Sequence, residues 1–179
     1  FKMCLNAGNF SLHHFEKYNY PFENILIGIA KPSKVNSLKS LNINKEVLEN
    51  EIKKVKFFPR ELTIKQNLVR EFLRSFKKKE YSIAMYGTGH AACMFINLLR
   101  IKDLVDFAID DNIKKIGFYI PGSKIPIYDS RCLSDKNISL CLLGLSSESE
   151  EKIIKGHKTF KNSGGIFASI YPGSKYAIG

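Results

Sequence analysis

Long apolar runs are missing from this sequence. The longest candidates, residues 25–30 and 138–145, have the length of a strand, whereas a helix that crosses a bilayer needs about 20 apolar residues. No secretory signal is visible either. We therefore expect a cytoplasmic protein with no membrane partner. Because residue 1 is Phe rather than Met, we also expect the natural chain to begin upstream of it.

Cysteines are few, and their spacing argues against metal and disulfide frameworks. The four lie at positions 4, 93, 132 and 141; none forms a Cys-x-x-Cys pair, and no histidine cluster accompanies them. Cys141 falls within an apolar run and Cys93 within an expected helix. We therefore predict no metal site, and ordinary thiols in a reducing compartment.

Acidic residues are the minority charge. Lys and Arg number 28 against 17 Asp and Glu, which gives a net charge of +11. Such a surface favours anionic partners such as nucleotides or nucleotide sugars, although a solvated lysine-rich face is the more ordinary explanation of the charge. The aromatic and basic signatures of RNA-binding modules are missing, so we do not expect a nucleic-acid partner. Ser-His-Asp and paired-carboxylate constellations are missing too, so no catalytic residue is assigned.

What remains is a chain of 179 residues that divides into three stretches. Residues 1–32 predict two short strands, one around Phe10 to Phe15 and one from Phe22 to Ala30. Residues 33–79 predict a helical linker, with Asn44 as N-cap, an interruption at 57–59 and a second helix from about 61. We expect the two strands to form a β-hairpin-like piece ahead of this linker.

Residues 80–179 predict the main domain. Strands are expected at 82–86, 104–109, 138–143 and 165–170, with a helix after Gly89 and another from Ser147, where Ser147-x-x-Glu150 is a capping-box candidate. Alternation of strands and helices predicts a mostly parallel sheet with flanking helices. The expected fold class is therefore α/β and Rossmann-like, in a single domain of ordinary size.

The segment Gly87-Thr88-Gly89 is the strongest functional signal. An apolar strand ends at this turn, a helix follows, and Asp110 lies 23 positions after Gly87, near the ~20 expected for a ribose-binding carboxylate. Glycines let a backbone approach a phosphate, a helix start attracts anions, and the small Ala92 lets the helix pack on the strand. The candidate substrate- or nucleotide-binding residues are Gly87, Thr88, Gly89, His90, Asp110, Asp111 and Lys115.

Each candidate also has a structural interpretation. The glycines suit a strand-to-helix turn without any ligand, and His90 suits an exposed helix start. The two aspartates suit a turn cap, and Lys115 suits a solvated surface. The sequence leaves these alternatives open.

The segment from Tyr81 onward resembles the C-terminal Rossmann-like domain of S-adenosylmethionine-dependent C-methyltransferases, which act on nucleotide-linked deoxysugars and related substrates. The family has a Tyr-Gly-Ala turn and helix before a strand that ends in aspartate, and then a Lys-x-Gly that leads into Pro-Gly-x-x-Ile-Pro-Ile. The matching positions are Tyr86, Gly87, Asp110, Lys115, Gly117, Pro121, Gly122, Ile125, Pro126 and Ile127. This resemblance implies a substrate resembling a nucleotide sugar and a methyltransferase domain upstream.

The chain also departs from the family pattern. It has Ala91-Ala92 where the family commonly has Lys-Gly, and Leu145-Ser146 where the family commonly has Trp-Asn. Residues 1–32 look similar to the end of a class I methyltransferase core, or form an independent hairpin. On the first interpretation, the whole enzyme uses S-adenosylmethionine and this chain alone does not bind it. The alternatives are a nucleotide- or CoA-binding regulatory module and, ranked lower, half of an NAD-dependent oxidoreductase.

Overall fold

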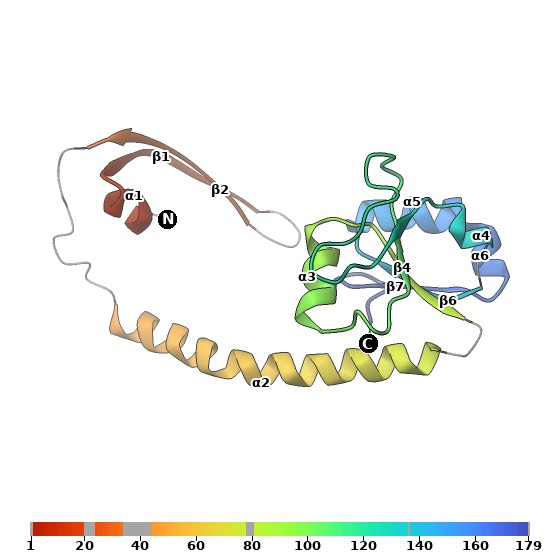
Figure 1. Ribbon diagram of the computed structural model, residues 1–179. Coiled ribbons are helices and arrows are strands. Elements are labelled where there is room, and N and C mark those ends of the chain that lie inside the picture. The colour runs from red at the N-terminus through yellow and green to blue at the C-terminus, as the bar shows by residue number, and fades with distance from the viewer. Residues whose placement is uncertain (1, 20–23, 34–43, 78–80, 136, 179) are drawn as a thin grey trace. The chain divides into compact units, whose positions relative to one another are not determined.

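The computed structural model comprises two compact units, Phe1–Lys54 and Val55–Gly179, which are described separately (Figure 1). The structure describes residues 2–19, 24–33, 44–77, 81–135 and 137–178. Within these ranges no helix is long and apolar enough to cross a membrane.

The N-terminal unit contains a helix followed by an antiparallel hairpin. Helix α1 (Lys2–Ala7) ends in a turn in which Asn9 adopts a φ of 60°. Strands β1 (Phe10–Asn19) and β2 (Asn24–Pro32) then pair, with a register shift between Leu12 and His14. The predicted hairpin is confirmed, although Phe22, the expected start of its second strand, lies outside the described residues. Within this unit the hairpin exposes many large apolar side chains: Phe10, Phe15, Tyr18, Ile25, Leu26, Ile27 and Ile29.

A helix of 32 residues, α2 (Lys45–Phe76), follows. Its predicted N-cap is confirmed, because the Asn44 side-chain oxygen accepts a 2.9 Å hydrogen bond from the Glu46 backbone N–H. The predicted interruption at 57–59 is wrong: the helix continues through Pro59. A proline removes only one backbone donor and its fixed φ is compatible with a helix, so the neighbouring turns can hold the helix together at a cost of about 3 kcal/mol.

The second unit is built on five parallel strands in the order β5-β4-β3-β6-β7. They are β3 (Ser82–Tyr86), β4 (Phe107–Ile109), β5 (Ile127–Tyr128), β6 (Ile138–Leu143) and β7 (Ile166–Ser169). The connecting helices are α3 (His90–Leu98), α4 (Cys132–Asp135), α5 (Ser147–Gly156) and α6 (Lys158–Asn162). The chain starts at the central strand β3, builds outward to β5, and then crosses to β6. This is the doubly wound arrangement, so the predicted Rossmann-like fold class is confirmed.

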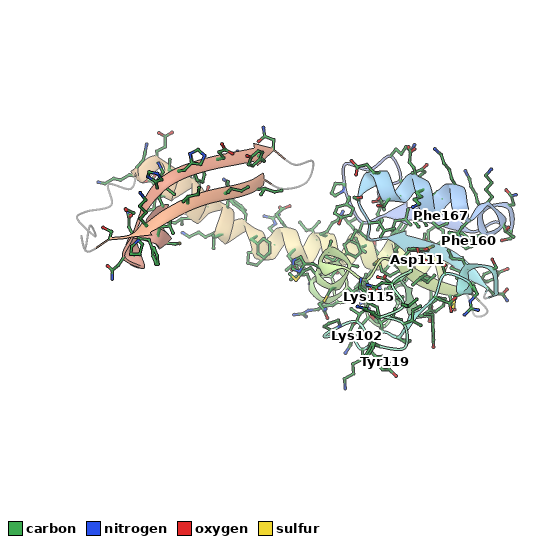
Figure 2. The ribbon with its side chains drawn as sticks, turned by 90° about the horizontal axis from the view of Figure 1, so that it is seen from above. Lys102, Asp111, Lys115, Tyr119, Phe160 and Phe167 are labelled. Atoms are coloured by element: carbon green, nitrogen blue, oxygen red, sulfur yellow. The ribbon has the colours of Figure 1, made fainter. Side chains whose placement is uncertain are left out.

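Alternate residues of the sheet face two separate cores. Ile83 and Met85 pack on the side where the C-terminal half of α2 and α3 lie, with Leu73 and Ile96 among their fully buried neighbours. Ala84 and Tyr86 face the other side, which α4, α5 and α6 cover (Figure 1). There Phe160 of α6 meets Phe167 of β7 edge to face, with ring centroids 4.8 Å apart (Figure 2). A helix-covered sheet of this kind is hydrophobic on both faces, as the sequence of β3 and β6 predicts.

The matched Pro-Gly segment is a packing feature. Gly122 has a φ of 82°, and a Cβ built on it would lie 2.6 Å from Oδ1 of Asn97 on α3. The Asn97 amide donates to the Pro121 carbonyl at 2.9 Å and to the Cys93 carbonyl at 2.8 Å. The loop between β4 and β5 is thereby tied to helix α3.

Some expected boundaries differ from the structure. Strand β4 is shorter than the predicted 104–109, because Leu104 and Val105 turn back and donate to the Ile101 carbonyl. Strand β5 was not predicted at all. The Ser147–Glu150 capping box is wrong: the N-cap of α5 is Ser146, and Glu150 is 2% exposed and accepts hydrogen bonds from hydroxyls outside the helix.

Further chain segments bond to both outer strands of the sheet. Beside β5, Ile127 exchanges hydrogen bonds with Gly117 and Phe118, at 3.0 and 2.9 Å. Beside β7, the Ser169 N–H donates to the Tyr176 carbonyl at 2.7 Å and Ile178 donates back to Ser169 at 3.1 Å.

Candidate functional site

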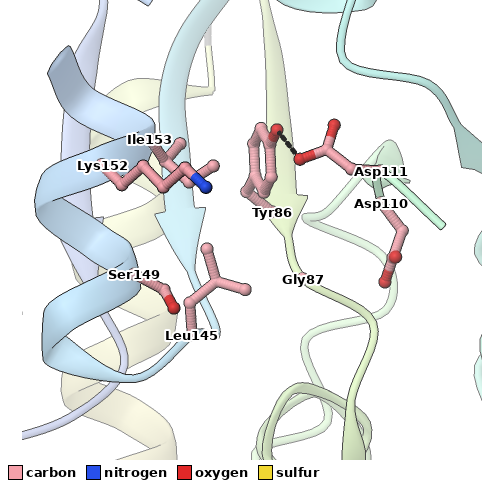
Figure 3. A pocket seen from close by; sticks show the side chains of 8 residues that line it. All are labelled: Tyr86, Gly87, Asp110, Asp111, Leu145, Ser149, Lys152 and Ile153. Carbon is pink, nitrogen blue, oxygen red and sulfur yellow. Dashed lines mark hydrogen bonds between the residues drawn. The ribbon is translucent and has the colours of Figure 1, made fainter. Parts of the chain in front are cut away.

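A cavity of about 280 Å³ opens at the carboxyl ends of β3, β4 and β6. The strand order runs from β3 to β5 on one side of the sheet and from β6 to β7 on the other, so it reverses between β3 and β6. Ligands of doubly wound sheets bind in the crevice at such a point. Figure 3 shows the side chains around it, with the β3 and β4 ends on one side and α5 on the other. The lining residues are Tyr86, Gly87, Asp110, Asp111, Leu145, Ser149, Lys152 and Ile153.

Gly87 is required by the fold itself. Its φ of 88° lies in the region that favours glycine, and its N–H donates to the Ile109 carbonyl at 2.8 Å. A Cβ at this position would lie 2.5 Å from Cδ2 of Leu145, which is too close for either group to stay in place. The first glycine of the turn therefore has a structural role whether or not a ligand binds.

Gly89 differs from Gly87 in both respects. It is the N-cap of α3, its φ of −76° suits any residue, and a Cβ built on it would meet no atom within 4 Å. Packing within the chain thus gives no reason for a glycine here. The open space lies beside the first turn of a helix that has no side-chain cap, where backbone N–H groups favour an anion.

The small residue Ala92 has the packing role that the sequence predicts. It is fully buried, and a Cβ on Gly144 in the loop after β6 would lie 2.9 Å from the Ala92 Cβ. Helix α3 can therefore lie close to the end of β6.

Asp110 binds the turn to the loop after β4. Its carboxylate accepts hydrogen bonds from the Thr88 N–H (3.0 Å), the Thr88 hydroxyl (2.5 Å), the Asn112 N–H (3.0 Å) and the Lys115 ammonium (2.8 Å). Burial alone would raise the pKa of Asp110, but the bonds from Lys115, Thr88 and Asn112 outweigh it and lower the pKa to about 2. Asp110 is therefore charged and already fully engaged inside the protein.

Asp111, by contrast, lines the cavity with a carboxylate that is largely accessible. It is exposed and accepts a 2.7 Å hydrogen bond from the hydroxyl of the buried Tyr86 (Figure 3). Burial first, and then this bond to Asp111, raise the pKa of Tyr86 well above its ordinary value, so the phenol remains a donor. The second carboxylate oxygen of Asp111 accepts no hydrogen bond from the residues that the structure describes.

The opposite wall comes from α5, which sequence reasoning did not assign to the site. Ser149 and Lys152 lie one turn apart on this helix and line the cavity together with Ile153. A lysine on the exposed face of an amphipathic helix carries no sequence signal of its own, so only the topology could reveal it.

The predicted site residues are therefore not all brought together. Gly87, Asp110 and Asp111 line the cavity. Thr88 and Lys115 contact Asp110 instead, and Figure 2 shows Lys115 on the loop that follows β4. Gly89 and His90 lie at the start of α3, both exposed, and are not among the lining residues.

Metal-binding geometry is absent from the ranges that the structure describes: no group of three or more His, Cys, Asp or Glu side chains is arranged to hold an ion. No disulfide joins Cys4, Cys93, Cys132 and Cys141, and Cys141 is buried.

Comparison with known proteins identifies the family. No curated protein matches the chain. Among solved structures it is similar to UDP-D-quinovosamine 4-dehydrogenase from Vibrio fischeri, with 24% sequence identity, a TM-score of 0.40, and coverage of 51% of this chain and 79% of that one. The model of the C-methyltransferase C-terminal domain family matches residues 30–172, which is well over half of the 179 residues. The chain therefore belongs to the C-methyltransferase C-terminal domain family.

Proposed function

We propose that this chain is the C-terminal part of an S-adenosylmethionine-dependent C-methyltransferase. Its α/β unit would help to hold an anionic, nucleotide-sugar-like substrate against a catalytic domain that lies upstream. Family membership supports the first statement. The observation that carries the second is the cavity at the point where the strand order reverses, which is lined by the accessible carboxylate of Asp111.

Asp111 is the residue that we assign to substrate hydroxyl groups. Asp110 already accepts four hydrogen bonds within the protein, whereas one oxygen of Asp111 accepts no hydrogen bond from the described residues. Tyr86 fixes the Asp111 carboxylate from behind. A sugar hydroxyl would therefore find a charged, oriented acceptor at this wall of the cavity.

The start of α3 is the second contact that we propose. Open space beside Gly89 would let a phosphate approach the free N–H groups of the first helical turn, with Thr88 and His90 next to it. Lys115 would act indirectly, because its ammonium group neutralises Asp110 and reduces repulsion of an anion. The net charge of +11 also favours an anionic substrate.

The N-terminal stretch, residues 1–32, would be the end of the methyltransferase core. Helix, turn and antiparallel hairpin follow one another there, and the apolar side chains that the hairpin exposes suit a strand pair that completes a larger sheet. Residues 33–79 would be the helical linker and 80–179 the substrate-binding domain. The whole enzyme would use S-adenosylmethionine, bound upstream and not by this chain. We place the enzyme in the cytoplasm, where cysteines that form no disulfide are ordinary.

The test is calorimetric titration of the chain with UDP, UDP-glucose and S-adenosylmethionine. We expect the two nucleotides to bind and S-adenosylmethionine not to bind. Asp111→Asn should weaken UDP-glucose binding at least about tenfold, because a hydrogen bond to a charged group is worth roughly 1.5–3 kcal/mol. Gly89→Val should also weaken binding of both nucleotides, since its side chain would enter the space in which a Cβ meets no atom within 4 Å. Glu71→Gln, which removes a charge from the exposed face of α2, is the matched control.

Two outcomes would contradict the proposal. One is the absence of nucleotide binding to the wild-type chain; the other is binding of S-adenosylmethionine to this chain alone. The alternative function is a nucleotide- or CoA-binding regulatory module without chemistry. It would be favoured if the coding sequence upstream of Phe1 held no methyltransferase core.

A further inference from the structure

The two walls of the cavity carry opposite charges. Asp111 stands at the β4 end, and the ammonium group of Lys152 extends from α5 into the space on the other side, toward Tyr86 (Figure 3). The second aspartate of the lining, Asp110, is neutralised by Lys115 at 2.8 Å. Asp111 and Lys152 are therefore the two charges that an incoming ligand would meet.

Lys152 has no ion-pair partner among the described residues, unlike Lys155 and Lys175. Lys155, one turn further along α5, pairs with Glu151 at 3.5 Å, and Lys175 pairs with the same carboxylate. Glu151 is thus engaged by two cations already. A lysine that points into a cavity without a carboxylate beside it leaves its charge available to an anion.

The size of the cavity limits what can fill it. Its volume of about 280 Å³ is just below the ~300–1,000 Å³ that small-molecule sites occupy. A whole nucleotide sugar is too large for this space, whereas one sugar ring with one phosphate is of a suitable size. The apolar side chains of Leu145 and Ile153 supply a surface for the carbon face of such a ring.

We propose that Lys152 anchors a phosphate group of the substrate, and that the cavity seats a hydroxylated sugar ring bearing this phosphate, with its hydroxyls toward Asp111. This inference rests on the proposed function and deepens it by naming the part of the substrate that the cavity holds. The opposite charges of the walls fix the orientation of the ring. The ring is either the ribose or the hexose of a nucleotide sugar, and both share this chemistry.

The test compares UMP, glucose 1-phosphate, uridine and glucose by calorimetric titration of the full chain. UMP binding assigns the ribose half, and glucose 1-phosphate binding the hexose half. Lys152→Ala should weaken the phosphorylated probe at least about tenfold, which corresponds to about 1.4 kcal/mol. Binding of the unphosphorylated counterpart should stay unchanged. Lys152→Arg should stay within about threefold of the wild type, because the charge is kept.

Lys155→Ala is the matched control, since it removes the same charge from the same helix outside the cavity. The inference is overturned if Lys152→Ala binds the phosphorylated probe as tightly as the wild type while UDP-glucose binding persists; the proposed function then survives. An equal loss in Lys155→Ala also overturns it, because the effect would be general electrostatics. If the wild-type chain binds neither UDP-glucose nor any probe, the proposed function fails and the inference with it.

Discussion

Replacing Gly87 with alanine should destabilise the α/β unit strongly. The backbone φ of 88° is unfavourable for an L-residue by about 1–2 kcal/mol. The new Cβ would also lie 2.5 Å from Leu145 Cδ2, 3.0 Å from its Cγ and 3.1 Å from the Gly144 carbonyl oxygen. Overpacking of this kind costs about 1–3 kcal/mol. The expected loss of unfolding free energy is therefore about 2–5 kcal/mol, a large share of the ~5–15 kcal/mol of an ordinary domain.

A double-mutant cycle separates the two contributions. In a Leu145→Ala background the closest neighbour is gone, so the same Gly87→Ala change should cost less: about 1–2 kcal/mol for the backbone, together with the contact to the Gly144 carbonyl oxygen that remains at 3.1 Å. Gly89→Ser is the control in the same turn, because a Cβ there meets no atom within 4 Å and serine is a good N-cap. It should change stability by less than about 0.5 kcal/mol.

Urea denaturation followed by circular dichroism gives each free energy. A cost below about 1 kcal/mol for Gly87→Ala would contradict both contributions, since the backbone part alone should reach that value. A cost that is unchanged by Leu145→Ala would refute the steric part and leave the backbone part.

Other residues allow further predictions. The pKa of Asp110 is lowered to about 2 from 3.8, so its charged form stabilises the fold fully at a pH above 3.8, and this stabilisation is lost as the pH falls toward 2. Over that range the unfolding free energy of the wild type in urea should therefore drop by roughly 2 kcal/mol more than that of Asp110→Asn. Parallel pH profiles of the two proteins would contradict this. Glu150→Ala removes the acceptor of the Ser174 hydroxyl (2.6 Å) and should cost about 2–4 kcal/mol in urea denaturation, with faster proteolysis of residues 171–178, whereas Glu150→Gln should cost less. Tyr86→Phe removes the bond to Asp111 and should lower stability by about 1–2 kcal/mol in thermal denaturation; an unchanged midpoint would show that the bond has no net value.

The sequence predicts the sheet well where burial is complete. Residues 82–86 and 138–143 are short apolar runs between polar residues, and they form β3 and β6 with those bounds. Strand β5 escapes prediction because it has two residues and follows Pro126, so its pairing depends on the neighbouring strand rather than on local pattern. The helix break predicted at Pro59 is wrong for a related reason. A proline favours a break locally, but the turns on either side of it keep α2 continuous.

The site was predictable only in part. Glycine spacing and the aspartates after β4 point to the right edge of the sheet, because the topology of parallel strands brings these loops together. Asp110 differs from Asp111 because it accepts hydrogen bonds from Thr88, Asn112 and Lys115. Sequence spacing does not predict these bonds. The α5 wall lies about 60 residues further along the chain from the turn, and contact at that separation is decided by strand order.

The bonded outer strands of the α/β sheet have a consequence for assembly. An unpaired outer strand is a place where a strand from another segment can add. Here the segment at 117–118 occupies one side and residues 176–178 the other, so both ladders of this sheet are already extended. In the hairpin, by contrast, β1 and β2 each have a single neighbour among the described residues. A strand that joins the hairpin would therefore bond directly to β1 or β2, whereas a strand that joins the α/β sheet would first meet the segments at 117–118 or 176–178.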